Sequence, residues 1–419
     1  MRSRGGVWGR RRPAVVALVA VLVVAAAAVV TYRVLAPAEV LTPARADYPA
    51  PVRAATGVVG TLASAPLIVD GRLRVYATTR QIRADEPVDA RTRRTPYWSY
   101  RRWPAELIGI VASGTTVVSR WSDGDLVALD ARTGRIRWRA DGPPPGHGYD
   151  GRRTGASTVY TPAGLIPATA SGGRAVLVVI GGSGLRGLDL TDGRELWRVD
   201  IDGSCRAGAL TTTAGQLVTV DACASPQVVE FHDVQTGRLV NRWRPEDAGP
   251  ELAVAPVGCG NGGSNCPALR TTSGGSSRGW LLGRGEPTPM PLLDPNEVVL
   301  EGDVALTPSG NELVARSVRE GTELWRRTGP GPVRIVAVQP GLVHLLTDAH
   351  ELITLNSTTG AQRSSFPLVA GDEVVPWRPG FAYAADGFVA VERLARAAPS
   401  DAADAQFYAA PQPVILAAS

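Results

Sequence analysis

The sequence predicts an all-β fold, a β-propeller of seven or eight blades, preceded by one N-terminal transmembrane helix. Two observations predict the propeller: a short segment that ends in Trp recurs along the chain, and strand-sized apolar runs precede most of its copies. A third predicts the helix, because residues 14–30 read AVVALVAVLVVAAAAVV without a polar side chain. Gly and Pro account for 47 and 33 of the 419 residues, which indicates many tight turns and argues against long helical bundles.

The N-terminus predicts a membrane anchor. Residues 1–12 form an Arg-rich tail, and residues 13–32 form the expected signal-anchor helix. Because basic flanks stay in the cytoplasm, we expect a single-pass protein of the cell membrane whose N-terminus is cytoplasmic and whose propeller is extracytoplasmic. A cleaved signal peptide is the alternative, since Ala36-Pro37-Ala38 has the small residues of a cleavage site. The length of the apolar run favours the anchor, and the sequence leaves cleavage open.

The segments that flank the propeller have different compositions. Residues 33–60 are rich in Ala and Pro and show no hydrophobic period, so we expect an extended spacer that lifts the propeller off the membrane. The propeller itself is expected over residues 61–395, followed by a C-terminal tail over 396–419. A strand from one terminus should complete a blade begun by the other, and residues 57–62 (GVVGTL) or 413–417 (PVILA) could supply it.

The charge distribution argues against a nucleic-acid partner. The chain has 44 basic and 39 acidic residues, and six of the Arg residues lie within residues 1–33, which hold no acid. The rest of the chain is therefore nearly balanced. A nucleic-acid-binding domain would carry a basic face, so we expect none here.

The recurring segment has the chemistry of a β-hairpin followed by an outer strand. An Asp or Asn accepts hydrogen bonds from nearby backbone amides, and a Gly a few residues later supplies a positive φ. These features together close a tight turn between two strands. The copies are residues 126–138, 185–197, 228–243, 313–325 and 352–366, with a weaker copy at 82–98.

The large aromatic residue that ends each copy is expected to pack between neighbouring blades rather than to bind a ligand. Successive aromatic ends lie 40, 59, 46, 82 and 41 residues apart, close to the 40 to 45 residues of a propeller blade or to twice that length. The longest gap should hold a degenerate blade around Trp280. The predicted blade tryptophans are Trp98, Trp138, Trp197, Trp243 and Trp325, and Phe366 ends the last copy.

The pattern apolar-x-Ala-Leu-Asp-x-x-Thr-Gly-x-x-x-Trp resembles the PQQ-like propeller repeat, and the resemblance covers roughly residues 65–395. This repeat occurs in quinoprotein alcohol dehydrogenases and in the non-enzymatic propeller lipoprotein of the outer-membrane barrel assembly machinery. The chain departs from it where Arg93 replaces the turn Gly, Ser317 replaces Asp and Phe366 replaces Trp. The dehydrogenases carry adjacent cysteines and calcium ligands, whereas no two cysteines adjoin here. The resemblance therefore implies the fold without the cofactor.

Four cysteines predict two disulfides. Cys205 and Cys223 flank an expected hairpin, and Cys259 and Cys266 enclose a short Gly-rich loop. Of the three possible pairings, the one that joins each of these local pairs demands least of the chain. Such bonds persist in an oxidising compartment. Four buried thiols are the alternative, and zinc is disfavoured because no C-x-x-C pair occurs.

The sequence predicts no catalytic, cofactor-binding or metal-binding residue. The four histidines (His147, His232, His344 and His350) show no metal-ligand spacing, and neither a nucleophile elbow nor a phosphate loop occurs. His344 lies in an apolar strand and is interpreted as a core histidine. Two irregular segments are candidate contact surfaces: residues 97–104, which mix aromatics with Arg, and residues 140–157, which lengthen one repeat.

Together these features favour a non-enzymatic function. We expect a membrane-tethered scaffold whose propeller holds an unidentified protein partner in envelope assembly or secretion, without a cofactor. The competing hypothesis is a quinoprotein-like oxidoreductase or a small-molecule sensor that uses the central channel. Since one fold supports many functions, the repeat alone does not decide between them.

Overall fold

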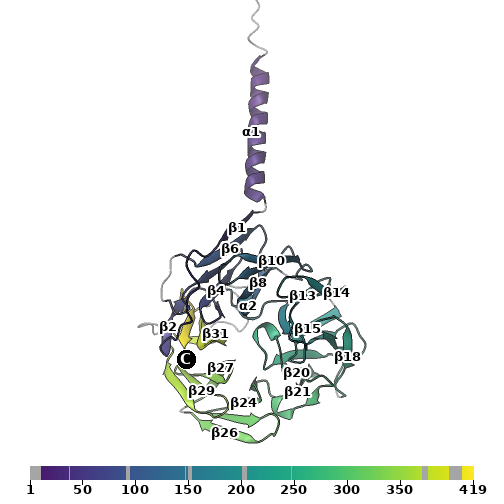
Figure 1. Cartoon of the computed structure of the whole chain (residues 1–419), viewed down its shortest axis with the longest axis vertical. Helices are drawn as coiled ribbons and strands as arrows, with labels where there is room; N and C mark the ends of the chain where they lie inside the picture. Colours follow the sequence, from purple (N-terminus) through teal and green to yellow (C-terminus); the bar gives the residue numbers. More distant parts are fainter. Residues whose placement is uncertain are drawn as a thin grey trace, which may run out of the picture.

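The computed structural model describes one helix followed by a ring of β-sheets (Figure 1). The helix is α1 (Arg11–Leu35), and the ring surrounds a central cavity, here called the channel. The described residues are 11–36, 38–90, 95–146, 148–149, 153–200, 205–246, 248–329, 331–369, 376–395 and 408–419.

The ring is an eight-bladed propeller, because the described strands form eight antiparallel sheets arranged around the channel. Most blades take four strands in chain order, from the channel outward. We number the blades 1 to 8 by the order of their inner strands. Blade 1 contains β3 (Pro66–Val69), β4 (Leu73–Thr78), β5 (Gln81–Asp85), β6 (Trp98–Trp103) and β1 (Ala38–Thr42); blade 2 contains β7 (Leu107–Ser113), β8 (Thr116–Trp121), β9 (Asp125–Asp130) and β10 (Ile136–Asp141); blade 3 contains β11 (Leu165–Thr169), β12 (Ala175–Gly181), β13 (Gly184–Asp189) and β14 (Glu195–Asp200).

Blades 4 to 8 complete the ring. Blade 5 is irregular, since its outer strand has only two residues and is followed by the short 3-10 helix η4 (Pro291–Leu293). Blade 4 contains β15 (Arg206–Thr211), β16 (Gln216–Asp221), β17 (Val228–Asp233) and β18 (Leu239–Trp243); blade 5 contains β19 (Ala253–Val257), β20 (Ala268–Ser273), β21 (Ser276–Leu281) and β22 (Thr288–Pro289); blade 6 contains β23 (Val299–Glu301), β24 (Val304–Ser309), β25 (Glu312–Ser317) and β26 (Glu323–Thr328); blade 7 contains β27 (Val333–Gln339), β28 (Leu342–Thr347), β29 (Glu351–Asn356) and β30 (Gln362–Pro367); blade 8 contains β31 (Trp377–Ala385), β32 (Phe388–Ala395), β33 (Val414–Ala418) and β2 (Gly57–Leu62).

Blade 8 closes the ring with strands from both ends of the chain. Strand β2 pairs antiparallel with β33, from Gly57 opposite Ala418 to Leu62 opposite Val414. Both segments that the sequence offered for ring closure therefore take part, and they pair with each other. Because the outer strand comes from the N-terminal side, opening the ring would require breaking this pairing.

The prediction of a spacer over residues 33–60 is wrong, because this segment contributes two strands to the propeller. Strand β2 lies in blade 8, and β1 pairs with β6 as a fifth strand of blade 1. Glu39 of β1 fixes this position by binding Arg139 at 2.5 Å and Arg102 at 3.0 Å. The Ala- and Pro-rich composition gave no sign of strand β1, because the residues that bind it lie far along the chain. Only two residues separate α1 from β1, which leaves no room for a spacer.

The helix α1 lies where the sequence predicts a helix. The large hydrophobic side chains in its described part, from Val16 to Val29, are 53 to 68% exposed. No helix among the described residues is both long and apolar enough to cross a membrane. Most of the Arg-rich tail (residues 1–10), Pro37 of the alternative cleavage site and residues 396–407 of the C-terminal tail lie outside the described residues.

Four of the five predicted blade tryptophans join their own blade to the next. Each indole N–H donates to a backbone carbonyl of the following blade, and three of the four side chains are buried, with Trp325 partly exposed. In each case the ring also lies against the turn Gly of the next repeat. The bonds run from Trp98 to Ala131 at 2.8 Å, from Trp138 to Leu190 at 3.0 Å, from Trp197 to Val234 at 2.7 Å and from Trp325 to Ser357 at 2.8 Å.

Candidate functional site: a channel entered by two loops

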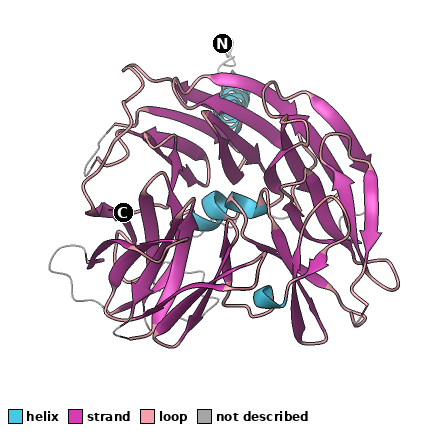
Figure 2. Cartoon of the chain, turned by 60° about the horizontal axis from the view of Figure 1, so that its bottom comes forward, coloured by secondary structure: helices cyan, strands magenta, loops and turns pink. Residues whose placement is uncertain are grey.

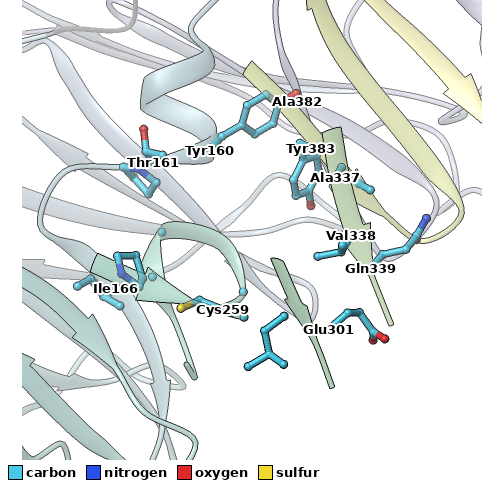
Figure 3. Close-up of a pocket in the computed structure, with 18 of the residues that line it drawn as sticks. Tyr160, Thr161, Ile166, Cys259, Glu301, Ala337, Val338, Gln339, Ala382 and Tyr383 are labelled. Carbon is cyan, nitrogen blue, oxygen red and sulfur yellow. The ribbon is translucent and has the colours of Figure 1, made fainter. Parts of the chain in front are cut away.

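The centre of the propeller holds a cavity of about 850 Å³ (Figure 3). Inner strands of blades 3 to 8 line it, with the segment that follows β19. Most of the lining consists of Gly backbone and small or apolar side chains such as Ile166, Leu300 and Val338. Glu301 is the charged residue among the described lining, and its Oε1 accepts a hydrogen bond from the Gly341 amide at 2.9 Å. The cavity therefore suits an uncharged occupant.

The insertion predicted as a contact loop (residues 140–157) leads into this channel. Its residues 147 and 150–152 lie outside the described part of the chain. It continues into the short helix α2 (Ala156–Tyr160), which lies at the centre of the ring (Figure 2). The ring of Tyr160 stacks on Tyr383 with centroids 4.8 Å apart, and its hydroxyl donates to the Pro66 carbonyl at 3.0 Å. Burial raises the pKa of both tyrosines well above its usual range, so both stay neutral.

Residues just before α2 bind the blade that closes the ring. The Thr154 hydroxyl donates to Glu392 Oε1 at 2.5 Å, and both residues are almost fully buried. The Arg153 guanidinium donates to the Ala410 carbonyl at 2.9 Å and lies 4.8 Å from the centre of the Tyr408 ring. The insertion, which connects blade 2 to blade 3, thus also binds the closing blade 8.

A buried arginine in blade 2 fixes the root of the insertion. Arg120 is 1% exposed and donates to the carbonyls of Ala163, Gly164 and Ile180 at 3.2, 3.1 and 2.7 Å, and to Pro143 at 3.0 Å. Burial lowers its pKa to about 10, which still leaves it charged at neutral pH. The sequence analysis missed this residue, although an Arg within the apolar strand TVVSRW was the available signal.

A second loop enters the channel between β19 and β20. Cys259 and Cys266 close it with a disulfide, and Cys259 faces the cavity (Figure 3). Asn265 Oδ1 accepts a hydrogen bond from the Thr169 amide of blade 3 at 3.2 Å. A Cβ on Gly262 would lie 3.4 Å from Pro162, which follows α2. The two loops therefore meet inside the ring.

These loops enter from opposite ends of the channel. The insertion leads into the inner strand β11, whereas the disulfide loop leaves the inner strand β19. Because the blades are built from four antiparallel strands in chain order, their inner strands all run in the same direction along the channel. The start of β11 and the end of β19 therefore lie at opposite ends of the channel. The channel is thus narrowed from both sides by the chain itself.

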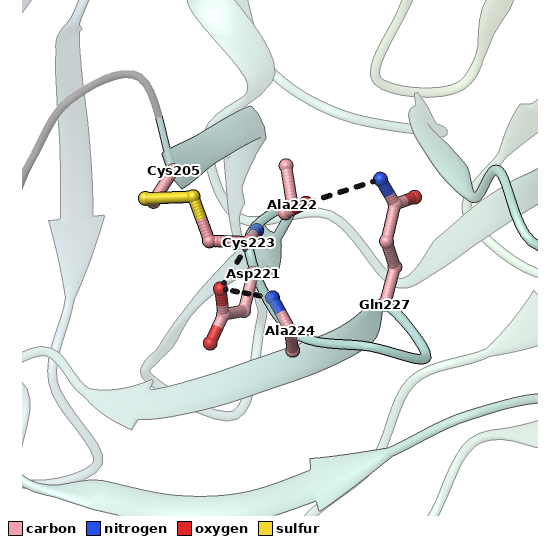
Figure 4. The surroundings of a disulfide bond; sticks show 6 residues. All are labelled: Cys205, Asp221, Ala222, Cys223, Ala224 and Gln227. Atoms are coloured by element: carbon pink, nitrogen blue, oxygen red, sulfur yellow. Dashed lines mark hydrogen bonds between the residues drawn. A yellow bond between two sulfur atoms is a disulfide. The ribbon is translucent and has the colours of Figure 1, made fainter.

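Both predicted disulfides are present with the local pairing. Cys205 is joined to Cys223 (Figure 4), and Cys259 is joined to Cys266. Beside the first bond, Asp221 Oδ1 accepts hydrogen bonds from the amides of Cys223 and Ala224 at 3.2 and 3.1 Å. This bond therefore closes the end of the β15–β16 hairpin in blade 4.

The described histidines and acids do not gather into a reactive group. His344 is fully buried, with its ring nitrogens 2.9 Å from Gln339 Nε2 and 3.0 Å from Thr354 Oγ1. Burial lowers its pKa to about 4, so it is a neutral core histidine, as the sequence predicts. His147 lies outside the described residues. Within the described part of the chain, no three His, Cys, Asp or Glu side chains are placed to hold a metal ion.

The repeats match a known family. A family model described as outer membrane protein assembly factor BamB matches residues 52–144 and 95–258. These repeats are PQQ-like propeller repeats. The matched part runs from β2 to β19, so it covers blades 1 to 4 apart from β1, the outer strand of blade 8 and the first strand of blade 5. No curated protein matches the chain.

Three solved structures match the chain at low sequence identity. BamB from Moraxella catarrhalis is 14% identical over 90% of this chain and 99% of its own, with a TM-score of 0.43. The computationally designed Ika8 protein is 13% identical over 86% and 99%, with a TM-score of 0.49. The C-terminal WD40 domain of Sif2 is 11% identical over 87% and 96%, with a TM-score of 0.48.

The other predicted contact segment, residues 97–104, forms β6 of this PQQ-like propeller and has two different faces. Tyr100 and Arg102 are buried toward blade 2, where Arg102 binds Asp123 at 3.0 Å and Asp125 at 2.6 Å. Arg101 and Trp103 lie on the other face, and Arg101 is exposed. Half of the segment thus packs inside the ring, and half is available for contact.

Proposed function

We propose that this chain is a non-catalytic scaffold that holds a protein partner in envelope assembly or secretion, with α1 as its membrane tether and the propeller on the extracytoplasmic side. The match of residues 52–258 to a model described as an outer membrane protein assembly factor carries this proposal. The two loops inside the channel support it, because they leave the outer surface of the blades as the larger accessible area.

The tether is supported by the sequence and by the surface of α1. Residues 14–30 contain no polar side chain and follow a cluster of Arg residues. The large apolar side chains from Val16 to Val29 are exposed by at least 53%, and burying them in lipid would remove this area from water. The Arg residues of the tail favour a cytoplasmic N-terminus.

An exposed apolar pair on blade 4 offers a contact for the protein partner. Leu239 and Val240 are 44 and 54% exposed on β18, the outermost strand of its sheet. The strand pairing skips Val240 between Leu239 and Asn241, so this apolar pair lies at a β-bulge of the sheet edge. An edge strand also presents unpaired backbone groups, to which an extended segment of a partner could add.

Co-purification tests the proposal. The full-length protein is extracted from native membranes in mild detergent, and mass spectrometry identifies every protein and small molecule that stays bound. We expect one protein at a fixed ratio to the chain. A variant with Leu239→Asp and Val240→Asp should lose it. The matched control Leu324→Asp, which changes a residue 42% exposed on the outer strand of blade 6, should retain it.

The cavity of about 850 Å³ is the observation that favours a second function, the binding of a small molecule in the channel. The same experiment separates the two. A quinone, metal ion or metabolite bound at a fixed ratio, with no protein partner, would contradict the scaffold and support the channel site.

A further inference from the structure

The outward face of blade 1 carries an amphipathic group of side chains beside α1. Arg101 and Trp103 share this face of β6, and Val40 of β1 lies directly opposite Arg101 in the strand register. Arg80, from the turn between β4 and β5, joins them. We call these four residues, Val40, Arg80, Arg101 and Trp103, the blade 1 patch.

The patch combines aromatic, cationic and apolar groups. The Arg80 guanidinium lies 4.0 Å from the centre of the Trp103 ring. Val40 is 57% exposed, and Arg101 is exposed without an ion-pair partner among the described residues. Trp and Arg with long apolar stems are the residues that suit the boundary between water and lipid, because each has an apolar body and a polar end.

The position of the patch follows from the missing spacer. Helix α1 ends at Leu35, and Ala38, the first residue of β1, lies opposite Trp103. Three residues of extended chain span at most about 11 Å. Trp103 therefore lies at the end of blade 1 that is nearest to α1, which Figure 1 shows directly above β1 and β6.

We infer that the blade 1 patch lies in the headgroup layer of the bilayer and fixes the propeller against the membrane surface. This inference rests on the proposed tether, since α1 is what brings the patch to the bilayer. Val40 and the exposed part of the half-buried Trp103 ring reach the boundary of the acyl chains, while Arg80 and Arg101 extend to the phosphates. The propeller is then held in one orientation rather than swinging on a flexible linker.

Neighbouring acids limit the role of charge in this contact. Arg80 lies 3.7 Å from Glu106, and on the buried face Arg102 is engaged by Glu39 and by Asp123. The surroundings are therefore close to neutral, unlike a polybasic lipid-binding segment. The contact should form on zwitterionic vesicles and should change little when anionic lipid is added.

Site-specific labelling tests the inference on the full-length protein. The described residues contain no free cysteine, so an Arg101→Cys variant can carry a single polarity-sensitive fluorophore. The matched control is Arg319→Cys, since Arg319 is 77% exposed on blade 6. On transfer from detergent to phosphatidylcholine vesicles, the emission at position 101 should shift to the blue, and the emission at 319 should not. An equal response at both positions would overturn the inference.

Quenching by lipid provides a second measurement that needs no label. Vesicles with bromine near the top of the acyl chains should quench part of the Trp emission, and Trp103→Phe should remove some of that quenched component. Trp280→Phe, in blade 5, should not change it. Quenching that is the same in wild type and Trp103→Phe would contradict the inference.

Flotation separates failure of the patch from failure of the tether. If the full-length protein does not float with vesicles after an alkaline wash, the tether is wrong and the inference fails with it. If the protein floats but neither position 101 nor Trp103 senses lipid, the tether stands and the patch inference is overturned.

Discussion

Six of the eight interfaces between blades fall into two kinds. At four of them, from blade 1 to blade 4 and from blade 6 to blade 7, a Trp donates to the next blade and lies on its turn Gly. The two interfaces that flank blade 5 lack this arrangement. Blade 4 ends in Trp243, but blade 5 has no turn Gly of the repeat to receive it. Blade 6 has the turn Gly, Gly321, but no Trp lies against it, since a Cβ added to Gly321 would meet nothing within 4 Å.

Different interactions hold the irregular blade. Trp243 meets Trp280 edge to face, with centroids 4.7 Å apart. Arg270 is 8% exposed and donates to the carbonyls of Leu293 and Pro295, both at 2.8 Å, which fixes η4 where a regular outer strand would lie. Both disulfides also lie in blades 4 and 5. Loss of the repeat in one blade thus removes two Trp contacts, and buried polar and covalent links stand in their place.

The largest effect is expected at a regular interface. Trp197→Ala should lower the free energy of unfolding by about 3 to 5 kcal/mol, because it leaves a cavity between blades 3 and 4 and removes the bond to Val234. Denaturant unfolding of the full-length protein measures this. The control Trp325→Ala should cost less, since Trp325 is partly exposed. Equal small losses in both variants would mean that the Trp contact does not stabilise the regular interfaces.

The next effect is expected in the irregular part. The Cys205–Cys223 bond closes a loop of 18 residues, and Cys259–Cys266 one of 7. Loop-closure entropy then gives losses of about 3 and about 2 kcal/mol for the paired Cys→Ser variants. Unfolding with and without a thiol reductant checks this, and the reductant should not destabilise a variant that lacks both bonds. A wild-type protein indifferent to reductant would contradict the role of the disulfides.

The features that the sequence could predict are those encoded by neighbouring residues. The turn residues and the Trp of each repeat lie within one hairpin and outer strand, so residues 126–138 already specify three strand-sized pieces. The disulfide pairs are local for the same reason. Ring closure was also foreseeable, because an eight-bladed ring needs a strand from each terminus and few segments near the ends are apolar enough.

The features that escaped prediction depend on contacts distant in the chain. Strand β1 becomes ordered through β6 and through Arg139, 100 residues beyond Glu39. The five-residue helix α2 is too short to be stable alone, and Tyr160 is fixed by Tyr383 of blade 8, which is distant in the chain. Arg120 has no local signature other than a charge in an apolar strand. Composition and period carry no information on such pairs.

His344 of blade 7, a blade that keeps the repeat, should change the free energy of unfolding with pH by about 3 kcal/mol at most. The folded state lowers the pKa of His344 from 6.5 to about 4, so as the pH falls the unfolded chain binds the proton first. The contribution to stability is complete above about pH 6.5 and is lost as the pH falls toward 4. His344→Gln should flatten this part of the curve of unfolding free energy against pH. An unchanged slope would show that His344 is not held neutral by the fold.

The smallest effect gives the sharpest test, because two turn glycines differ only in the Trp that faces them. Gly193 and Gly321 have φ of +76° and +70°, so Ala at either position incurs the cost of a left-handed backbone, about 1 to 2 kcal/mol. At Gly193 the added Cβ would also lie 2.6 Å from the Trp138 ring, whereas at Gly321 it would meet nothing within 4 Å.

Gly193→Ala should therefore destabilise the protein by about 2 kcal/mol more than Gly321→Ala, as expected for overpacking. Combining Gly193→Ala with Trp138→Ala should remove that excess, since the ring that the methyl group meets is gone. Denaturant unfolding of Gly193→Ala, Gly321→Ala, Trp138→Ala and the double variant measures the coupling. If the two Gly→Ala variants are equally stable, the turn glycines serve only the turn. A difference that vanishes without Trp138 shows that the same glycine also receives the neighbouring blade, a role that Gly321 has lost beside blade 5.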